Sequence, residues 1–274
     1  MKFSIVTPGF NSAASIAACV LSVLHQSFND YEHIIIDNLS TDDTVKIIRS
    51  LYQQHGKEAK LRVISEADSG ISDAFNKGVA KAAGEYILIL NSDDALYNEN
   101  ILELVNDFAA GESYPVIHGD MYFRDQEFGS NIRTPLFCRL EAAMPYNHPG
   151  MFIHRDVYQQ FGCYDTRYKV AMDYEFILRL DTRMPNFTKR IGYLNWVPLT
   201  RSSAGGMSWR NEQRGIDEVV MALKEFKRYN LYARYHYCAR TVRTTIKGVL
   251  RSVELTSLVK LWRRWKWGNL STGV

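Results

Sequence analysis

The chain has 274 residues, of which 46% are hydrophobic, and its net charge at pH 7 is +3. This length is enough to bury a substantial core, as one large domain or as one domain with an appendage. No segment reaches the roughly 20 consecutive apolar residues of a membrane-spanning helix. The first residues also lack the apolar core and cleavage site of a signal peptide, so we expect a cytoplasmic protein.

Four cysteines lie far apart in the sequence and match no metal-binding or redox spacing. We expect them to be reduced and mostly buried, as in a cytosolic protein: Cys19, Cys138, Cys163 and Cys238.

Charge is distributed unevenly along the chain. Residues 221–274 contain 12 Lys and Arg but only 2 Asp and Glu, whereas the whole chain has 33 and 30. Residues 1–220 therefore hold 21 basic and 28 acidic side chains. An acidic body with a basic tail suggests an anionic partner for the tail.

The first 90 residues alternate between strand-like and helix-like segments. We expect strands, the first with its turn, at 2–11, 31–38, 61–66 and 85–90, and helices at 12–26, 41–56 and 69–84. Asn11 or Ser12 would cap the first helix, and Gly56 and Gly84 would end the other two. This alternation predicts βαβ units and an α/β fold with a mainly parallel sheet.

The pattern becomes weaker from about Val116. Residues 116–123 are typical of a further strand, 148–165 of a loop, strand and short helix, and 171–180 of the start of a helix. From there we expect a helical and increasingly basic chain. We predict a domain and a helical extension, bounded as follows: 1–215, with halves 1–115 and 116–215, and 216–274.

Polar residues follow each of the four predicted strands, at 7–11, 37–38, 65–70 and 91–94. Ligands bind outside the carboxyl ends of the strands in open parallel sheets, so a site is expected there. Asp93 and Asp94 are suited to Mg²⁺ or Mn²⁺ shared with substrate phosphates. The alternative is that they cap a helix beginning at residue 95.

Three further carboxylates each allow two interpretations. Asp37 could contact a nucleobase or ribose, or it could close an Asx-turn. Asp73 and Lys77 share a helix face and could form only an exposed ion pair. Asp173 could serve as a general base, or as another acid at a helix N-terminus.

A small-residue segment and two histidines also allow both a functional and a structural interpretation. The small-residue segment 202–208 could be a loop that closes over a phosphate-bearing ligand, or a linker before a helix. His148 and His154 are more often structural than functional in such settings.

Four segments together resemble glycosyltransferase family 2: "VTPGFNSAASIAACVLSVLHQSF", "IIIDNLSTDDT", "DSGISDAFNKGVAKAAGEYILILNSDD" and "AMDYEFILRL". They occur in the family's order and spacing over about residues 3 to 182. Members are inverting, nucleotide-sugar-dependent enzymes. The resemblance implies their GT-A fold, a Rossmann-like and mainly parallel sheet flanked by helices.

The resemblance also implies roles in donor binding. Pro8 and Phe10 match the loop that cradles the nucleotide, and Asp37 matches the acid that contacts the base. Asn91, Ser92 and Asp93 occupy the D-x-D position, so Asp93 would be the metal ligand, supported by Asp94. We place Asp73 with the donor-binding residues as well. The donor-binding set is therefore Pro8, Phe10, Asp37, Asp73, Asn91, Ser92 and Asp93.

Further roles follow from the same resemblance. Asp173 matches the catalytic base, and Gly205, Gly206 and Ser208 match a flexible loop. The chain departs from the pattern at two places: Asn38 stands where a second acid is common, and Asn91 replaces the first acid of D-x-D. Because Asn91 adds no charge, metal affinity would depend on Asp93, Asp94 and the diphosphate.

The implied activity is transfer of a sugar from a nucleotide-diphosphate sugar, a UDP-sugar, to an acceptor hydroxyl with Mn²⁺ or Mg²⁺. The expected acceptor is a lipid-linked saccharide of bacterial surface polysaccharide synthesis. One alternative is a non-catalytic nucleotide-sugar-binding or scaffold protein at the membrane, against which Asp93 and Asp173 both count. Another is a nucleotidyltransferase, but "TPGFNSAAS" has neither a glycine run nor a basic residue.

The tail at 239–267 carries apolar residues at steps of mostly three and four, interleaved with Lys and Arg and ending in tryptophans. This pattern predicts an amphipathic basic helix on the anionic inner face of the cell membrane. The alternatives are packing on the domain and a homodimer contact. No nucleic-acid-binding motif accompanies the charge, so no nucleic-acid partner is expected.

Overall fold

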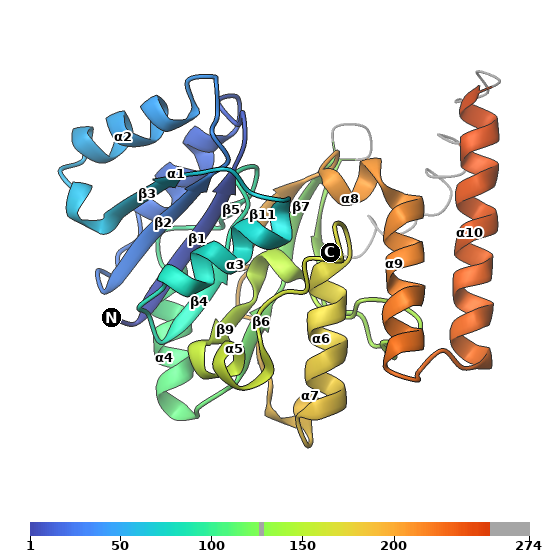
Figure 1. Ribbon diagram of the computed structural model, residues 1–274. Coiled ribbons are helices and arrows are strands. Elements are labelled where there is room, and N and C mark those ends of the chain that lie inside the picture. The colour runs from blue at the N-terminus through green and yellow to red at the C-terminus, as the bar shows by residue number, and fades with distance from the viewer. Residues whose placement is uncertain (126–128, 253–274) are drawn as a thin grey trace.

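A computed structural model describes residues 1–125 and 129–252 (Figure 1). Its largest feature is a seven-stranded sheet of order β10–β6–β9–β4–β1–β2–β3. β9 runs antiparallel to β4 and β6, and the other neighbours are parallel. This confirms the α/β fold with a mainly parallel sheet. The strands are β1 (Phe3–Gly9), β2 (Tyr31–Asp37), β3 (Leu61–Ser65), β4 (Tyr86–Ile89), β6 (Val116–Gly119), β9 (Phe152–His154) and β10 (Gly192–Leu194).

A second sheet has four strands in the order β5–β11–β7–β8. They are β5 (Ala95–Leu96), β7 (Met121–Asp125), β8 (Gly129–Arg133) and β11 (Thr200–Ser203). The helices are α1 (Ile16–Leu24), α2 (Thr44–Gln54), α3 (Ile71–Lys81), α4 (Ile101–Gly111), α5 (Arg155–Phe161), α6 (Met172–Arg183), α7 (Phe187–Arg190), α8 (Met207–Arg210), α9 (Glu212–Glu225) and α10 (Leu231–Ser252), with 3₁₀ turns η1 (Glu58–Lys60) and η2 (His148–Gly150).

The two faces of the large sheet are covered by different helices, as Figure 1 shows. Ile35 points into a core shared with α1, α2 and α4, whereas Ile34 and Ile36 point into a core shared with α3, α5, α6 and α9. All three side chains are fully buried. A strand covered on both faces requires such a continuous apolar run, which explains the sequence of β2.

The C-terminal helices lie beside the sheet domain, with α10 alongside α9 (Figure 1). Ile216 and Leu223 of α9 belong to the same core cluster as α6, as do Ala233 and Tyr237 of α10. The predicted division between residues 215 and 216 falls inside α9. Helix α9 therefore packs as part of the domain core.

Two helix boundaries differ from the prediction. α1 begins at Ile16 because residues 12–15 form a turn, in which the carbonyl of Ser12 accepts from the backbone N–H groups of Ser15 and Ile16. Neither Asn11 nor Ser12 therefore caps this helix.

Gly56 follows α2 with a positive φ of 61°, as a terminating glycine does. Gly84 lies beyond the end of α3 and instead packs against β1, where a Cβ would lie 2.5 Å from the Ser4 nitrogen.

The second half of the chain contains more strands than predicted. Residues 116–123 form parts of two strands in different sheets, because the chain passes from one sheet to the other at Asp120. β10 and β11 interrupt the segment expected to be helical, and their three and four residues are too few for a clear alternation. Of the cysteines, only Cys19 is buried and Cys238 is exposed, which corrects the expectation of mostly buried thiols.

A buried hydrogen-bond network joins side chains of β1, β2 and α2. His33 Nε2 lies 2.9 Å from the Thr7 hydroxyl, and its Nδ1 lies 2.7 Å from the Tyr52 hydroxyl. His33 is fully buried, and burial lowers its pKa to about 3. Burial also lowers the pKa of His118 to about 4. Both imidazoles are therefore held neutral in the folded protein.

We predict that His33 and His118 contribute a loss of stability as the pH falls from about 6.5 towards 4. The unfolded chain binds protons in this range that the folded chain excludes, so each such histidine lowers the free energy of unfolding by up to about 1.4 kcal/mol per pH unit. Denaturant unfolding measured at a series of pH values tests this. His33→Gln should flatten the dependence, whereas the same change at exposed His55 should not; an unchanged slope in His33→Gln would contradict the account.

Candidate functional site

A cavity of about 860 Å³ lies at the carboxyl ends of β1 and β4. Its wall also includes residues of the α6 N-terminus, of the second sheet and of α8. Nine of the residues selected from the sequence line it, although they come from segments up to about 200 positions apart: Pro8, Phe10, Asn91, Ser92, Asp93, Asp94, Asp173, Gly205 and Gly206.

The turn after β4 gives its two carboxylates different environments. Asp94 is 4% exposed, and its Oδ2 accepts a hydrogen bond of 3.0 Å from Asn91 Nδ2. Burial raises the pKa of Asp94 to about 7, although hydrogen bonds from Ser202 and Asn91 oppose the rise. No helix begins after Asp94: β5 follows, and α4 starts only after Asn100. The helix-cap alternative is therefore wrong.

The same turn can present oxygen ligands to a cation. Asp93 lines the cavity, and the buried Asn91 Oδ1 has no hydrogen-bond partner among the described residues. Within residues 1–125 and 129–252, no cluster of three or more His, Cys, Asp or Glu could hold a metal alone. The oxygens present therefore suit a hard cation completed by ligand oxygens and water, as is usual for Mg²⁺.

The loop after β1 is tied to this turn. The hydroxyls of Ser12 and Ser92 lie 2.9 Å apart, and Pro8 and Phe10 line the cavity beside them. Phe10 is 58% exposed, so its ring is available to a ligand. The two strand ends are thus held together by a direct side-chain contact.

Two of the predicted donor-binding residues lie outside the cavity lining. Asp37 is fully buried, and its carboxylate accepts hydrogen bonds from the Ser40 backbone N–H and the Ser65 hydroxyl. Asp73 accepts from the Ser69 backbone N–H at 2.9 Å, which lowers its pKa, and lies 3.8 Å from Lys77. Their contacts match the structural alternatives, and a donor-binding role for either stays a prediction.

Asn38 and Asp68 line the cavity near the ends of β2 and β3. Asn38 Oδ1 accepts a 2.9 Å hydrogen bond from the Asp68 backbone N–H, and Asp68 Oδ1 accepts one of 2.8 Å from Gly70. Gly70 has a φ of 126°, which side-chain-bearing residues rarely adopt. The sequence marked Asn38 only as a departure from a family pattern.

Asp173 occupies the first turn of α6, where its Oδ1 accepts a 2.8 Å hydrogen bond from the Tyr174 backbone N–H. The positive end of the helix dipole stabilises a carboxylate at this position. His148 lines the same cavity; burial lowers its pKa, and the negative charge of Asp173 opposes that change. His148 is thus at the site, whereas His154 is the N-cap of α5, and its side chain accepts from the Asp156 backbone N–H.

The second sheet and α8 supply side chains that sequence patterns missed. The Arg133 guanidinium carbon lies 3.2 Å from the centroid of the Phe123 ring, and Trp209 stacks on the same ring at 6.1 Å. All three line the cavity. Ser208 belongs to α8, directly after the predicted glycine loop. The position of Trp209 after that loop was the only signal that sequence offered.

Comparison with known proteins gives a family for the chain. The model of the family described as Glycosyl transferase family 2 matches residues 4–169. A PGL/p-HBAD biosynthesis glycosyltransferase of Mycobacterium tuberculosis (strain ATCC 25177 / H37Ra) is 32% identical over 208 residues, which cover 75% of this chain and 78% of that protein. The chondroitin synthase of Escherichia coli is 31% identical over 182 residues, covering 65% of this chain and 26% of the synthase.

Two solved structures resemble the fold. S. aureus TarS 1–349 in complex with UDP-GlcNAc has a TM-score of 0.67 at 18% identity, covering 82% of this chain and 65% of TarS. The mannosyltransferase PcManGT of Pyrobaculum calidifontis, in complex with GDP-Man and Mn²⁺, has a TM-score of 0.62 at 14% identity. The match covers 96% of this chain and 82% of PcManGT.

We predict that Asp94→Asn stabilises the ligand-free protein above pH 7. The pKa of Asp94 rises from its ordinary 3.8 to about 7 on folding, so the folded state bears the cost of a buried charge at high pH and loses that cost as the pH falls towards 4. The gain should be roughly 2–4 kcal/mol at pH 8 and near zero at pH 4. Thermal unfolding at both pH values measures it.

The matched control is Asp107→Asn on the exposed surface of α4, which should leave unfolding unchanged. Equal effects of Asp94→Asn at pH 8 and pH 4 would contradict the assignment.

Proposed function

This chain belongs to glycosyltransferase family 2, and from that premise we propose that it transfers a sugar with inversion from a nucleoside-diphosphate sugar to an acceptor hydroxyl. The observation that carries the proposal is the presence of Asp93 and Asp173 on one cavity. One carboxylate can serve the departing diphosphate and the other the attacking hydroxyl.

At the donor end, Asp93 and Asn91 Oδ1 would hold Mn²⁺ or Mg²⁺ together with diphosphate oxygens. The bound cation would neutralise the negative charge that grows on the leaving diphosphate. Pro8, Phe10 and Ser92 line the adjoining wall and would contact the nucleotide. A Cβ on Gly206 would lie 3.7 Å from Asp93 Oδ2, so the loop at Gly205 and Gly206 lies close enough to cover the diphosphate.

At the acceptor end, Asp173 would accept the proton of the acceptor hydroxyl. The hydroxyl oxygen then bonds to the anomeric carbon from the face opposite the diphosphate, and the bond from that carbon to the diphosphate oxygen breaks. The proton remains on Asp173 until it passes to water. Asp173 lies in the first turn of α6, so this helix sets the position of its carboxylate on the cavity wall.

The proposals for the donor, the acceptor and the metal draw on related proteins. A UDP-sugar is the proposed donor, supported by the UDP-GlcNAc complex of TarS. A lipid-linked saccharide of bacterial surface polysaccharide synthesis is the proposed acceptor; the support for a role in glycan synthesis comes from the relatives named for PGL/p-HBAD biosynthesis and as a chondroitin synthase. Metal dependence is supported by the Mn²⁺ complex of PcManGT and by the oxygens of Asp93 and Asn91.

The experiment is a panel of UDP- and GDP-sugars tested for hydrolysis and transfer with Mn²⁺ or Mg²⁺, in the native protein and in Asp173→Asn. The variant keeps the shape of the side chain but cannot accept the proton, so turnover should fall at least ~100-fold. Its donor affinity by calorimetry should stay within about twofold, because Asp173 acts on the acceptor.

Asp156→Asn is the matched control, since Asp156 lies in the first turn of α5. Near-normal turnover in Asp173→Asn would refute the base assignment. Donor binding without hydrolysis or transfer by the native protein would favour the non-catalytic alternative.

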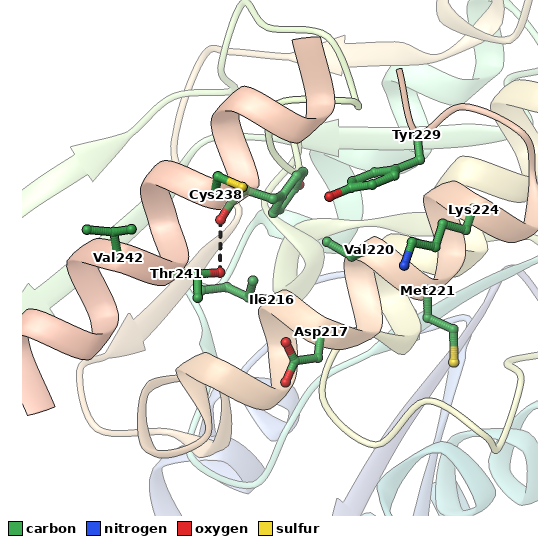
Figure 2. Close-up of a pocket in the computed structure, with 10 residues that line it drawn as sticks. Ile216, Asp217, Val220, Met221, Lys224, Tyr229, Cys238, Thr241 and Val242 are labelled. Carbon is green, nitrogen blue, oxygen red and sulfur yellow. Dashed lines mark hydrogen bonds between the residues drawn. The ribbon is translucent and has the colours of Figure 1, made fainter. Parts of the chain in front are cut away.

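We also propose an anionic membrane surface as a partner of α10. Between α9 and α10 lies a groove of about 500 Å³, lined mainly by apolar side chains (Figure 2). Val242 belongs both to this groove and to an exposed stripe on the outer side of α10, formed by Leu231, Tyr235, Val242 and Ile246. The stripe residues are between 54% and 80% exposed and recur at helical spacing.

Charge favours a lipid surface as the occupant of this stripe. α10 contains five Lys and Arg and no Asp or Glu in its 22 residues, and one of the five, Lys247, is ion-paired with Glu212 of α9. Each basic side chain near an anionic membrane adds about 1 kcal/mol of attraction. None of the described helices is long and apolar enough to cross a membrane. The contact that we propose is peripheral, at the cytoplasmic face. The predicted tail beyond Ser252 lies outside the described residues.

We predict that the protein co-sediments with phosphatidylglycerol vesicles at low salt but not with phosphatidylcholine vesicles. Val242→Ser with Ile246→Ser should weaken this binding roughly tenfold, by removing two apolar contacts. The double change Leu136→Ser with Phe137→Ser removes two other exposed apolar side chains and should have no effect. Absence of native binding to either vesicle, or equal binding by both double variants, would refute the proposal.

A further inference from the structure

A carboxylate of α9 binds the backbone segment that leads into the helix of Asp173. Glu218 is 7% exposed, and its carboxylate accepts hydrogen bonds from three successive backbone N–H groups: Lys169 at 3.0 Å, Val170 at 2.8 Å and Ala171 at 2.9 Å. Successive N–H groups that converge on one anion form a strong binding geometry. Glu218 is 47 to 49 residues away in the sequence, so this is a tertiary contact.

The carboxylate of Glu218 is itself fixed and charged. Arg214, one turn earlier on α9, donates from Nε to Glu218 Oε1 at 2.8 Å. Burial alone would raise the pKa of Glu218, but the bonds from Ala171, Lys169 and Val170 and from Arg214 lower it below the ordinary value. Charge-assisted hydrogen bonds of this kind are stronger than those between neutral groups.

The three bound N–H groups stand immediately before the site. Ala171 is the N-cap of α6, and Asp173 is the second residue of that helix. Val170 and Met172 line the cavity together with Asp173. The backbone orientation at 169–171 therefore sets the direction in which the Asp173 carboxylate enters the cavity.

α9 also connects this segment with other residues of the cavity wall. It directly follows α8, whose Arg210 lines the cavity, and Asn211 between the two helices lines it as well. Glu218 thus links α9, which follows the glycine loop and α8, to the backbone segment that leads to Asp173.

We propose that Glu218 is a positioning residue for Asp173, acting through the backbone of residues 169–171. This rests on the proposed role of Asp173 as the base. Loss of the Glu218 carboxylate would leave three N–H groups without their acceptor, and the α6 N-terminus would shift. A displacement of about 1 Å at a reacting group is enough to cost up to ~100-fold in rate.

The test compares Glu218→Ala and Glu218→Gln with Glu225→Ala. Glu225 lies on the same helix and binds the same loop, but through the side chains of Arg167 at 2.9 Å and Tyr168 at 3.3 Å. Glu218→Ala should lower kcat ~10- to 100-fold with donor KM changed less than about twofold. The kcat of Glu218→Gln should lie between those of Glu218→Ala and the native protein, because the amide oxygen still accepts a hydrogen bond but carries no charge. Glu225→Ala should keep kcat.

Folded protein is quantified by donor binding stoichiometry, and kcat is expressed per donor-binding site. A purely structural role predicts fewer binding sites with unchanged kcat per site, which would overturn the proposal, as would an equal loss of kcat in Glu225→Ala. If Glu218→Ala does not fold, the kcat of Glu218→Gln decides in the same way. Near-normal turnover in Asp173→Asn would refute the base itself, which is a separate outcome.

Discussion

The parallel pairing of β1 with both β2 and β4 determines where the chemistry of this protein lies. In this register Gly9 is opposite Asp37, and Val6 is opposite Ile89, so the polar residues that follow all three strands leave the sheet at one edge. The Ser12–Ser92 contact then joins two of these strand ends directly. Asp173, the proposed base, comes from elsewhere in the chain, in the first turn of α6, and Glu218 binds the backbone just before that helix.

The turn after β4 places its two adjacent carboxylates in different environments. Asp94 is buried and bonded to Asn91 and Ser202, so it holds the turn against β11 of the second sheet. Asp93 lies on the cavity wall. Asp94, which supports the turn, and Asp93, which lines the cavity, thus occur side by side. Asn91 Nδ2 donates to Asp94, while Asn91 Oδ1 has no hydrogen-bond partner among the described residues.

The sequence was informative where local pattern and motif coincide. The alternation of apolar runs predicted β1 to β4 and their helices, and the order of motifs predicted Asp93 and Asp173 on one site. It failed where tertiary contacts decide the structure: β10 and β11 are too short to show a period. The hydrogen bonds of Asp37 with Ser40 and Ser65 also depend on the fold, and its donor-binding role stays a prediction. Glu218 has the spacing of any exposed helical acid, and only the fold brings it to residues 169–171.

The central claim is that one cavity places the donor diphosphate at Asp93 and the attacking hydroxyl at Asp173. The most direct test is a crystal structure of Asp173→Asn with a UDP-sugar and Mn²⁺. The account predicts the diphosphate beside Asp93 and Asn91 Oδ1, with the free face of the anomeric carbon turned towards residue 173. A donor bound away from Asp93, or with that face turned from residue 173, would contradict it.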